Sequence, residues 1–152
     1  MDRNFDKKLS LYVMRNEHKY TGPFTRFEKL GGRFSATWHW PAFFVPAWWF
    51  LYRKMYLWAA IAFIVTIIPQ TWLLGAIAGG VSGNWLYYRK MKEDFKAIAK
   101  VKDKKFALQQ MGGVHGWVPW VAAFVNCVWL FAVASVWFMF LGMFAGFGGY
   151  PW

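Results

Sequence analysis

Charge is confined to three parts of this 152-residue chain, and uncharged blocks separate and follow them. The uncharged blocks run from 34 to 52, from 55 to 88 and from 106 to 152. A helix needs about 20 apolar residues to cross the hydrocarbon core of a bilayer, and all three blocks are near or beyond that length. Twelve tryptophans and 58% hydrophobic residues also exceed what one small water-soluble core holds. The pattern predicts an all-α integral membrane protein.

The first charged segment, residues 1–33, predicts a basic amphipathic head with a net charge of +4. Apolar residues within 4–15 recur at near-helical spacing, which favours a surface helix, with a strand through 11–14 as the alternative. A turn is expected at 21–23, followed by a short helix that stops at Gly31-Gly32. Because the segment is polar throughout, no cleaved signal peptide is expected, and the N-terminus is predicted to be cytoplasmic.

Residues 34–52 are predicted to be an interfacial aromatic segment that does not cross the membrane. They contain two prolines and several Trp and Tyr residues, which favour membrane interfaces. Lys and Arg near membrane ends favour the cytoplasmic side, and basic residues flank this segment at Arg33 and at Arg53-Lys54. In the alternative topology, residues 34–52 cross once and residues 55–88 cross back as one kinked helix.

Residues 55–88 predict a short helical hairpin. A single helix of this length would extend about 51 Å, well beyond a hydrocarbon core of roughly 30 Å. Pro69, Gln70 and Thr71 lie near the middle of the block and favour a turn there. The hairpin returns the pair Arg89-Lys90 to the side on which Arg53-Lys54 lies.

Residues 89–105 predict a basic amphipathic cytoplasmic helix that continues the hairpin and completes a membrane domain over 34–113. Its net charge of +5 favours an anionic lipid surface. Nucleic acid is not an expected partner, because no base-reading motif is present. Residues 114–152 predict a C-terminal transmembrane helix and an aromatic tail.

Small and polar residues in the uncharged blocks are candidates for helix packing. Gly75, Gly79 and Gly83 are four residues apart and predict a smooth helix face. We favour a contact within the chain, with another subunit as the alternative. Asn126 lies inside the last block, so we expect it to bond to a neighbouring helix or a ligand. The spacing of four recurs once, at Gly142 and Gly146.

Aromatic and basic residues at the ends of the predicted membrane segments are candidates for contact with the lipid interface. Aromatic rings are ordinary anchors there, and Arg side chains form paired hydrogen bonds with phosphate. The candidates are Trp40, Trp48, Trp49, Tyr52, Arg53, Lys54, Tyr56, Arg89 and Lys90.

Three short motifs occur together within residues 12–113. They are W-x-AFF at Trp40, Ala42, Phe43 and Phe44, YRKMY at Tyr52 to Tyr56, and GN-x-x-Y at Gly83, Asn84 and Tyr87. Together they resemble the domain of unknown function 2628 family of small bacterial inner-membrane proteins. The resemblance implies a multi-pass protein of the inner membrane and implies no active site. The chain departs from the family pattern at His39 and Pro46, and residues after 113 have no counterpart in it.

Catalytic and metal-binding patterns are not found. All seven Asp and Glu residues lie within 1–33 and 89–105, so no acid is available at membrane depth. Cys127 is alone, and the histidines are not at metal-ligand spacing. An axial haem ligand at His39 or His115 is the alternative to an ordinary interface histidine. We expect no enzyme activity, no metal and no cofactor.

These features favour a non-enzymatic accessory or assembly subunit of a larger membrane complex, of a respiratory or photosynthetic kind. The expected partners are a bilayer with anionic lipids and other membrane subunits. One alternative is a self-assembling small transporter or channel, a homo-oligomer in which Gln70, Asn84 and Asn126 face the pore. Another is a membrane protein that binds anionic lipids.

Overall fold

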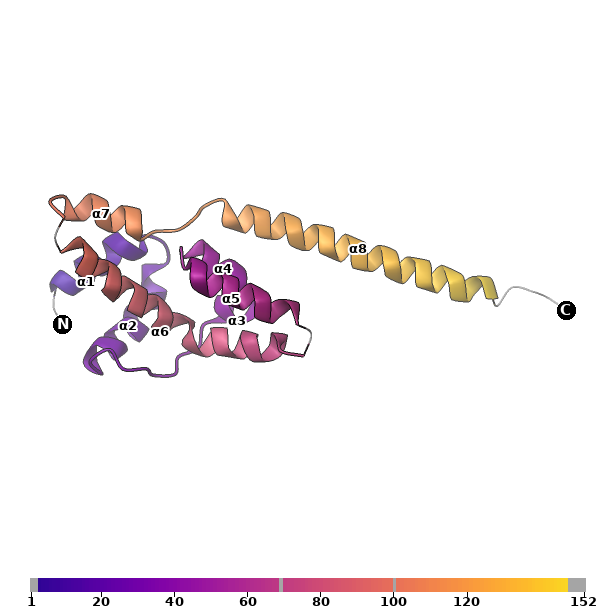
Figure 1. The fold of residues 1–152 in the computed structure, drawn as a ribbon, viewed down its shortest axis with the longest axis horizontal. Helices are drawn as coiled ribbons and strands as arrows, with labels where there is room; N and C mark the ends of the chain where they lie inside the picture. The colour runs from indigo at the N-terminus through magenta and orange to yellow at the C-terminus, as the bar shows by residue number, and fades with distance from the viewer. Residues whose placement is uncertain (1–2, 69, 100, 148–152) are drawn as a thin grey trace. The chain divides into compact units, whose positions relative to one another are not determined.

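The computed structural model describes residues 3–68, 70–99 and 101–147, and it confirms the all-α prediction. These residues form eight helices and no strand (Figure 1). The chain divides into two compact units, Met1–Gly116 and Trp117–Trp152. Seven of the helices belong to the first unit and one to the second.

The first two helices, α1 (Arg3–Val13) and α2 (Glu17–Lys29), pack into the first unit and do not form a separate surface head. The helix favoured within 4–15 is confirmed and the alternative strand through 11–14 is wrong, because Arg3–Val13 is helical. The helix is not a surface helix, since Leu9, Tyr12 and Val13 are fully buried. The turn expected at 21–23 is also wrong, because α2 runs through Pro23. Burial of the apolar face of α2 outweighs the backbone hydrogen bond that a proline removes.

Two glycines end α2 where the sequence predicted. Gly31 and Gly32 have φ angles of 65° and 82°, in the left-handed region that favours glycine. The amide of Gly32 donates to the carbonyl of Phe27 at 2.8 Å, which closes the last turn.

The aromatic segment folds as two short helices, α3 (Trp40–Phe44) and α4 (Pro46–Tyr52). Each has a proline in its first turn, where the missing N–H of proline has no helical partner to lose. No single helix spans residues 34–52, and neither α3 nor α4 alone is long enough to cross a bilayer. Instead α3 packs on α6, and α4 packs on α5 and α6. The position of this segment relative to a membrane stays a prediction.

The predicted helical hairpin is present as α5 (Tyr56–Ile67) and α6 (Trp72–Ile98), which pack against each other. Pro69 of the expected turn lies outside the described residues. The Thr71 hydroxyl lies within hydrogen-bond distance of the Val65 and Ile68 carbonyls at the end of α5, at 2.9 and 3.2 Å, and the Thr71 amide donates to the Ile68 carbonyl at 3.0 Å. The single kinked helix of the alternative topology is therefore wrong.

The apolar leg of α6 continues into the basic segment without a break, as predicted, but the basic helix does not reach residue 105. It ends at Ile98, and α7 (Lys104–Met111) follows. The Asp103 carboxylate accepts a hydrogen bond from the amide of Phe106 at 3.1 Å, so it caps the start of α7. This local cap was not foreseen.

The second unit contains α8 (Val118–Phe147). Its stretch Val118–Met143 has a mean hydropathy of 2.1 and is the one helix in the described part of the chain that is long and apolar enough to cross a membrane. By comparison, the 12 residues of α5 extend only about 18 Å. The predicted aromatic end at 148–152 lies outside the described residues.

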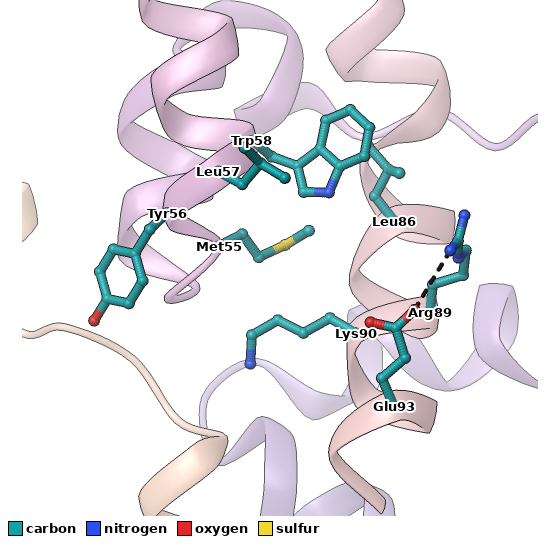
Figure 2. A pocket seen from close by; sticks show the side chains of 8 residues that line it. All are labelled: Met55, Tyr56, Leu57, Trp58, Leu86, Arg89, Lys90 and Glu93. Atoms are coloured by element: carbon teal, nitrogen blue, oxygen red, sulfur yellow. Dashed lines mark hydrogen bonds and ion pairs between the residues drawn. The ribbon is translucent and has the colours of Figure 1, made fainter. Parts of the chain in front are cut away.

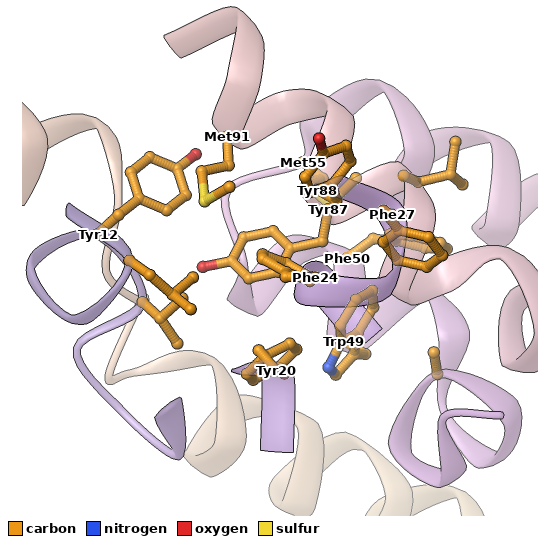
Figure 3. Close-up of a cluster of buried hydrophobic side chains, with 14 of the residues drawn as sticks. Tyr12, Tyr20, Phe24, Phe27, Trp49, Phe50, Met55, Tyr87, Tyr88 and Met91 are labelled. Carbon is orange, nitrogen blue, oxygen red and sulfur yellow. The ribbon is translucent and has the colours of Figure 1, made fainter. Parts of the chain in front are cut away.

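Aromatic rings dominate the core of the first unit (Figure 3). Tyr87 of α6 lies at its centre, with ring-centre distances of 5.3 Å to Tyr20 and 5.7 Å to Phe24. Its ring centre is also 5.9 Å from that of Tyr12 and 6.2 Å from that of Trp49. Such pairs contribute about 0.5–1.5 kcal/mol each beyond the area they bury. One residue of α6 thus connects α1, α2 and α4.

The glycine face of α6 is covered by helices of the same chain, as the internal-contact interpretation expected. A Cβ atom added at Gly79 would lie 2.6 Å from the carbonyl oxygen of Ala42 in α3. One added at Gly83 would lie 3.0 Å from the Cβ of Ala42. A Cβ at Gly75 would lie 2.5 Å from a methyl carbon of Val65 in α5. The missing side chains therefore allow α3 and α5 to approach α6 closely.

Replacing Gly79 with Ala is expected to lower the thermal unfolding midpoint of the purified full-length protein in mild detergent. The new methyl group would collide with the backbone of α3, and overpacking typically costs about 1–3 kcal/mol. Gly22→Ala in α2 is the matched control, because a Cβ there meets no described atom within 4 Å. The control is expected to leave stability unchanged or to raise it by up to about 1 kcal/mol. Equal midpoints for the two variants would contradict the close contact.

Candidate functional site

Arg53 is buried in the first unit and does not face lipid. Only 2% of the surface of this residue is exposed to solvent. Its Nη1 donates to the Val13 carbonyl and its Nη2 to the Arg15 carbonyl, each at 3.1 Å. The guanidinium carbon lies 4.6 Å from the ring centre of Tyr20 and 5.0 Å from that of Tyr87. The expectation that Arg53 pairs with a lipid phosphate is therefore wrong.

The acceptors of Arg53 lie on an unusual backbone segment between α1 and α2. Met14 and Asn16 have φ angles of 58° and 59°, and Lys54 next to Arg53 also has a φ of 59°. This conformation costs non-glycine residues roughly 1 kcal/mol or more each. The Arg53 hydrogen bonds join the two strained turns and offset part of that cost. No carboxylate of the described residues forms an ion pair with Arg53.

A second polar network connects α1, α6 and α7. The Tyr12 hydroxyl donates to the Asp94 carboxylate, and the Lys90 ammonium lies 2.7 Å from the same carboxylate. Lys90 also donates to the Tyr12 hydroxyl at 2.8 Å and to the Met111 carbonyl at 3.2 Å. Burial, with the Asp94 hydrogen bond and charge, raises the pKa of Tyr12 above its ordinary value. Tyr12 thus remains a neutral donor, and Lys90 is held by acceptors within the protein.

His39 lies among aromatic rings beside Arg53. Its ring centre is 4.7 Å from that of Trp49 and 5.6 Å from that of Tyr20. Burial, followed by the positive charges of Arg53 and Lys19, lowers the pKa of His39 to about 4. The imidazole is therefore neutral at neutral pH, and the rings around it do not favour the axial-ligand alternative.

The other candidate haem ligand, His115, lies at the end of the first unit. Its Nε2 is within hydrogen-bond distance of the Tyr56 hydroxyl, at 2.7 Å. Its amide donates to the Tyr52 carbonyl at 3.0 Å. These bonds join the segment after α7 to the α4–α5 region, which gives His115 a structural role.

A pocket of about 340 Å³ lies between the start of α5 and the middle of α6 (Figure 2). Figure 2 shows apolar side chains at one end and charged side chains at the other. The first turn of α5 forms part of the wall, and the backbone N–H groups of a first turn have no partner within the helix. The lining residues are Met55, Tyr56, Leu57, Trp58, Leu86, Arg89, Lys90 and Glu93.

The predicted interface residues do not form one surface. Trp40 and Tyr56 are 60% and 59% exposed, and Arg89 is also exposed. Trp49 is buried with Arg53, against the prediction, because both pack on Tyr87. The remaining predicted members, all half-buried, are Trp48, Tyr52, Lys54 and Lys90.

The resemblance motifs contribute both to the core and to the surface of the first unit. Asn84 and Tyr87 are each 1% exposed, and the Asn84 amide donates to the Thr37 hydroxyl at 3.2 Å. Phe44 is 69% exposed, and Phe43 is half-buried against the glycine face of α6. The motif residues therefore stabilise the packing of α3 and α4 on α6.

In α8, the Asn126 amide donates to the Ala122 carbonyl one turn earlier, at 2.7 Å. The expected partner on a neighbouring helix stays a prediction. A Cβ at Gly142 would meet no described atom within 4 Å. The surroundings of Gly146 lie outside the description of the side chains.

Sequence reasoning missed the pocket as a unit. Its charged end was visible as Arg89 and Lys90, but Trp58 and Glu93 were not considered. The spacing Leu86, Arg89, Lys90 and Glu93 places four residues on one face of α6, which is the signal that could have indicated a mixed apolar and charged wall.

Neither metal ligands nor relatives identify a reaction. Among the described residues, no group of three His, Cys, Asp or Glu side chains is placed to hold a metal ion. Comparison with protein-family models, with curated proteins and with solved structures finds no match to this chain.

Replacing Arg53 with Met is expected to lower the free energy of unfolding by about 2–4 kcal/mol, because two buried carbonyls lose their donor. The measurement is thermal or denaturant unfolding of the full-length protein in mild detergent, monitored by circular dichroism. Arg26→Met, at an exposed position of α2, is the control and is expected to change stability by less than about 0.5 kcal/mol. Similar effects of the two substitutions would show that the hydrogen bonds of Arg53 to Val13 and Arg15 do not stabilise the fold.

Proposed function

We propose that this protein is a non-enzymatic accessory or assembly subunit of a larger membrane complex. Its α8 crosses the bilayer, and its first unit is held at an anionic membrane surface with the α5–α6 hairpin inserted. The observation that carries the proposal is the exposed apolar end of an otherwise well-packed unit. The resemblance of residues 12–113 to the domain of unknown function 2628 family of inner-membrane proteins points in the same direction.

The apolar end of the first unit lies at the α5–α6 turn. In Figure 1 this turn lies at the end of the unit opposite α1 and α7. Phe63, Ile67 and Leu74 beside it are 58%, 64% and 67% exposed, and residues 55–88 contain no charged side chain. An exposed, contiguous apolar surface of this kind marks an interaction with a membrane or a protein.

Helix length favours partial insertion of the hairpin. At 12 residues α5 extends about 18 Å, short of a hydrocarbon core of roughly 30 Å. A chain that turns within lipid must satisfy its backbone polar groups internally. The Thr71 hydroxyl does this for the Val65 carbonyl, and the Thr71 amide does it for the Ile68 carbonyl. We therefore favour a hairpin that enters one leaflet and returns.

The opposite end of the unit supplies positive charge. Residues 1–33 and 89–105 have net charges of +4 and +5. Basic residues near an anionic leaflet contribute about 1 kcal/mol each. The positive-inside tendency supports a cytoplasmic location for this end.

The accessory role rests on α8. Within the described residues of its unit, α8 has no second helix to pack against. An asparagine inside an apolar helix, two turns from its start, is costly in lipid, which favours a neighbouring transmembrane helix as the partner of Asn126.

The channel alternative is less well supported. It requires Asn84 to face a pore, but Asn84 is buried and bonded to Thr37. The lipid-binding alternative is compatible with the accessory role, because the pocket beside Arg89 lies on the proposed membrane surface.

Cysteine accessibility is expected to detect partial insertion. The chain has one cysteine, so Cys127→Ser provides the background. In sealed membranes, Gln70→Cys at the hairpin turn is expected to resist a charged thiol reagent from both sides and to react once detergent is added. Gln109→Cys, exposed on α7, is the control and is expected to react from the cytoplasmic side. Labelling of Gln70→Cys from the other side would mean a full crossing, and labelling from the cytoplasmic side would mean no insertion.

Native mass spectrometry after mild-detergent purification from the native membrane is expected to show the chain in a fixed stoichiometry with larger subunits. Asn126→Leu is expected to lower the assembled fraction severalfold, because the interhelical hydrogen bond contributes about 1 kcal/mol. Ser135→Ala is the matched control, since Ser135 also bonds to its own helix, at 2.8 Å to Phe131. A homo-oligomer without other subunits would overturn the accessory role and favour transport.

A further inference from the structure

We propose that the pocket between α5 and α6 binds one anionic phospholipid, with its phosphate beside Arg89 and an acyl chain in the groove between the two helices. The inference rests on the proposed membrane location of the first unit and names the ligand of that surface. Its evidence is the position, charge and shape of two adjoining cavities.

The pocket lies at the level where α6 changes from apolar to charged. Arg89 is the first charged residue after the uncharged block 55–88, and it forms the wall together with Leu86 of that block. For a hairpin inserted into one leaflet, this level is the boundary between acyl chains and headgroups. A phosphate at this boundary would meet Arg89 without leaving its normal depth.

Arg89 provides the anion-binding group. Its guanidinium lies over the Trp85 ring at 5.2 Å, and one terminal nitrogen forms an ion pair with Glu93 at 3.4 Å. Both side chains of this pair are more than half exposed, so the pair adds little stability and a phosphate can displace or join it. A guanidinium can donate two parallel hydrogen bonds to a phosphate.

Lys90 also lines the pocket, but its ammonium group is bonded to the Asp94 carboxylate, the Tyr12 hydroxyl and the Met111 carbonyl, so Asp94 balances its charge. Arg89, whose pair with Glu93 is exposed, is therefore the cation to which we assign the preference for an anionic headgroup.

A second, apolar cavity of about 120 Å³ lies beside the pocket. The two cavities share Trp58 and Leu86, and the second also touches Val65, Gly75 and Gly79. A cationic mouth that leads into an apolar groove matches an amphiphile. Free phosphate or a nucleotide would fill only the mouth, so the occupant we infer is a phospholipid.

The test measures which lipids stay bound to the full-length protein. The protein is equilibrated in mixed micelles of phosphatidylglycerol and phosphatidylcholine, and retained lipid is counted by native mass spectrometry. We expect one phosphatidylglycerol per chain. Arg89→Gln is expected to lower its retention about tenfold, the effect of losing one charge-assisted contact. Arg26→Gln removes the same charge from an exposed site on α2 and is expected to leave retention unchanged.

A second variant tests the groove without changing charge. Ala78 is exposed and lines the apolar cavity, so Ala78→Phe is expected to fill it and lower retention while preserving the thermal unfolding midpoint. Retention at the wild-type level in this variant would overturn the groove as the acyl-chain site. Displacement of the lipid by millimolar inorganic phosphate would overturn the phospholipid as the ligand.

Flotation with phosphatidylglycerol vesicles distinguishes failure of the lipid site from failure of the membrane location. If the wild-type protein floats but retains phosphatidylglycerol and phosphatidylcholine equally, the site is overturned and the membrane location stands. The same holds if Arg89→Gln and Arg26→Gln lose equal amounts of bound phosphatidylglycerol. Absence of flotation by the wild-type protein would overturn both. Flotation with selective loss in Arg89→Gln supports both.

Discussion

The burial of Arg53 without a carboxylate partner is the constraint on which the first unit depends. A guanidinium removed from water needs acceptors for its N–H groups and a polarisable surrounding for its charge. The end of α1 and the link to α2 supply one acceptor for each terminal nitrogen, and tyrosine rings from α2 and α6 supply the surrounding. These groups must all be in place together, which explains why the helices around Arg53 are held so specifically. The aromatic cluster follows from this arrangement, since Tyr20 and Tyr87 belong to both.

The features that the sequence predicted correctly depend on local patterns. The charge-free blocks and the polar residues near position 70 were sufficient to find the α5–α6 hairpin, and glycines four residues apart indicated the face of α6 on which α3 packs. The long apolar run after residue 113 indicated α8. In each case, neighbouring residues determine the outcome, so no knowledge of the rest of the chain is required.

The features that the sequence did not predict depend on contacts between distant residues. Arg53 and Arg89 both begin an Arg-Lys pair beside an apolar block, and both were expected at the lipid interface. Only the tertiary structure distinguishes them, because the acceptors of Arg53 are about 40 residues away in the chain. Likewise, Pro23 reads locally as a turn, yet the burial of Tyr20, Phe24 and Phe27 keeps α2 helical. For the candidate site, its charged end could be read from the sequence, but its apolar wall from α5 could not.

The packing of α1 and α2 on the later helices also determines when the N-terminal part acquires a core. Tyr12, Phe24 and Phe27 are buried against Tyr87, Tyr88 and Phe95 of α6, some 60 to 80 residues later in the chain. During synthesis, these aromatic contacts of the first thirty residues therefore cannot form until α6 has left the ribosome. By then the whole α5–α6 hairpin has already been made. In this order of events the apolar hairpin comes first, and the basic N-terminal helices close over its base afterwards.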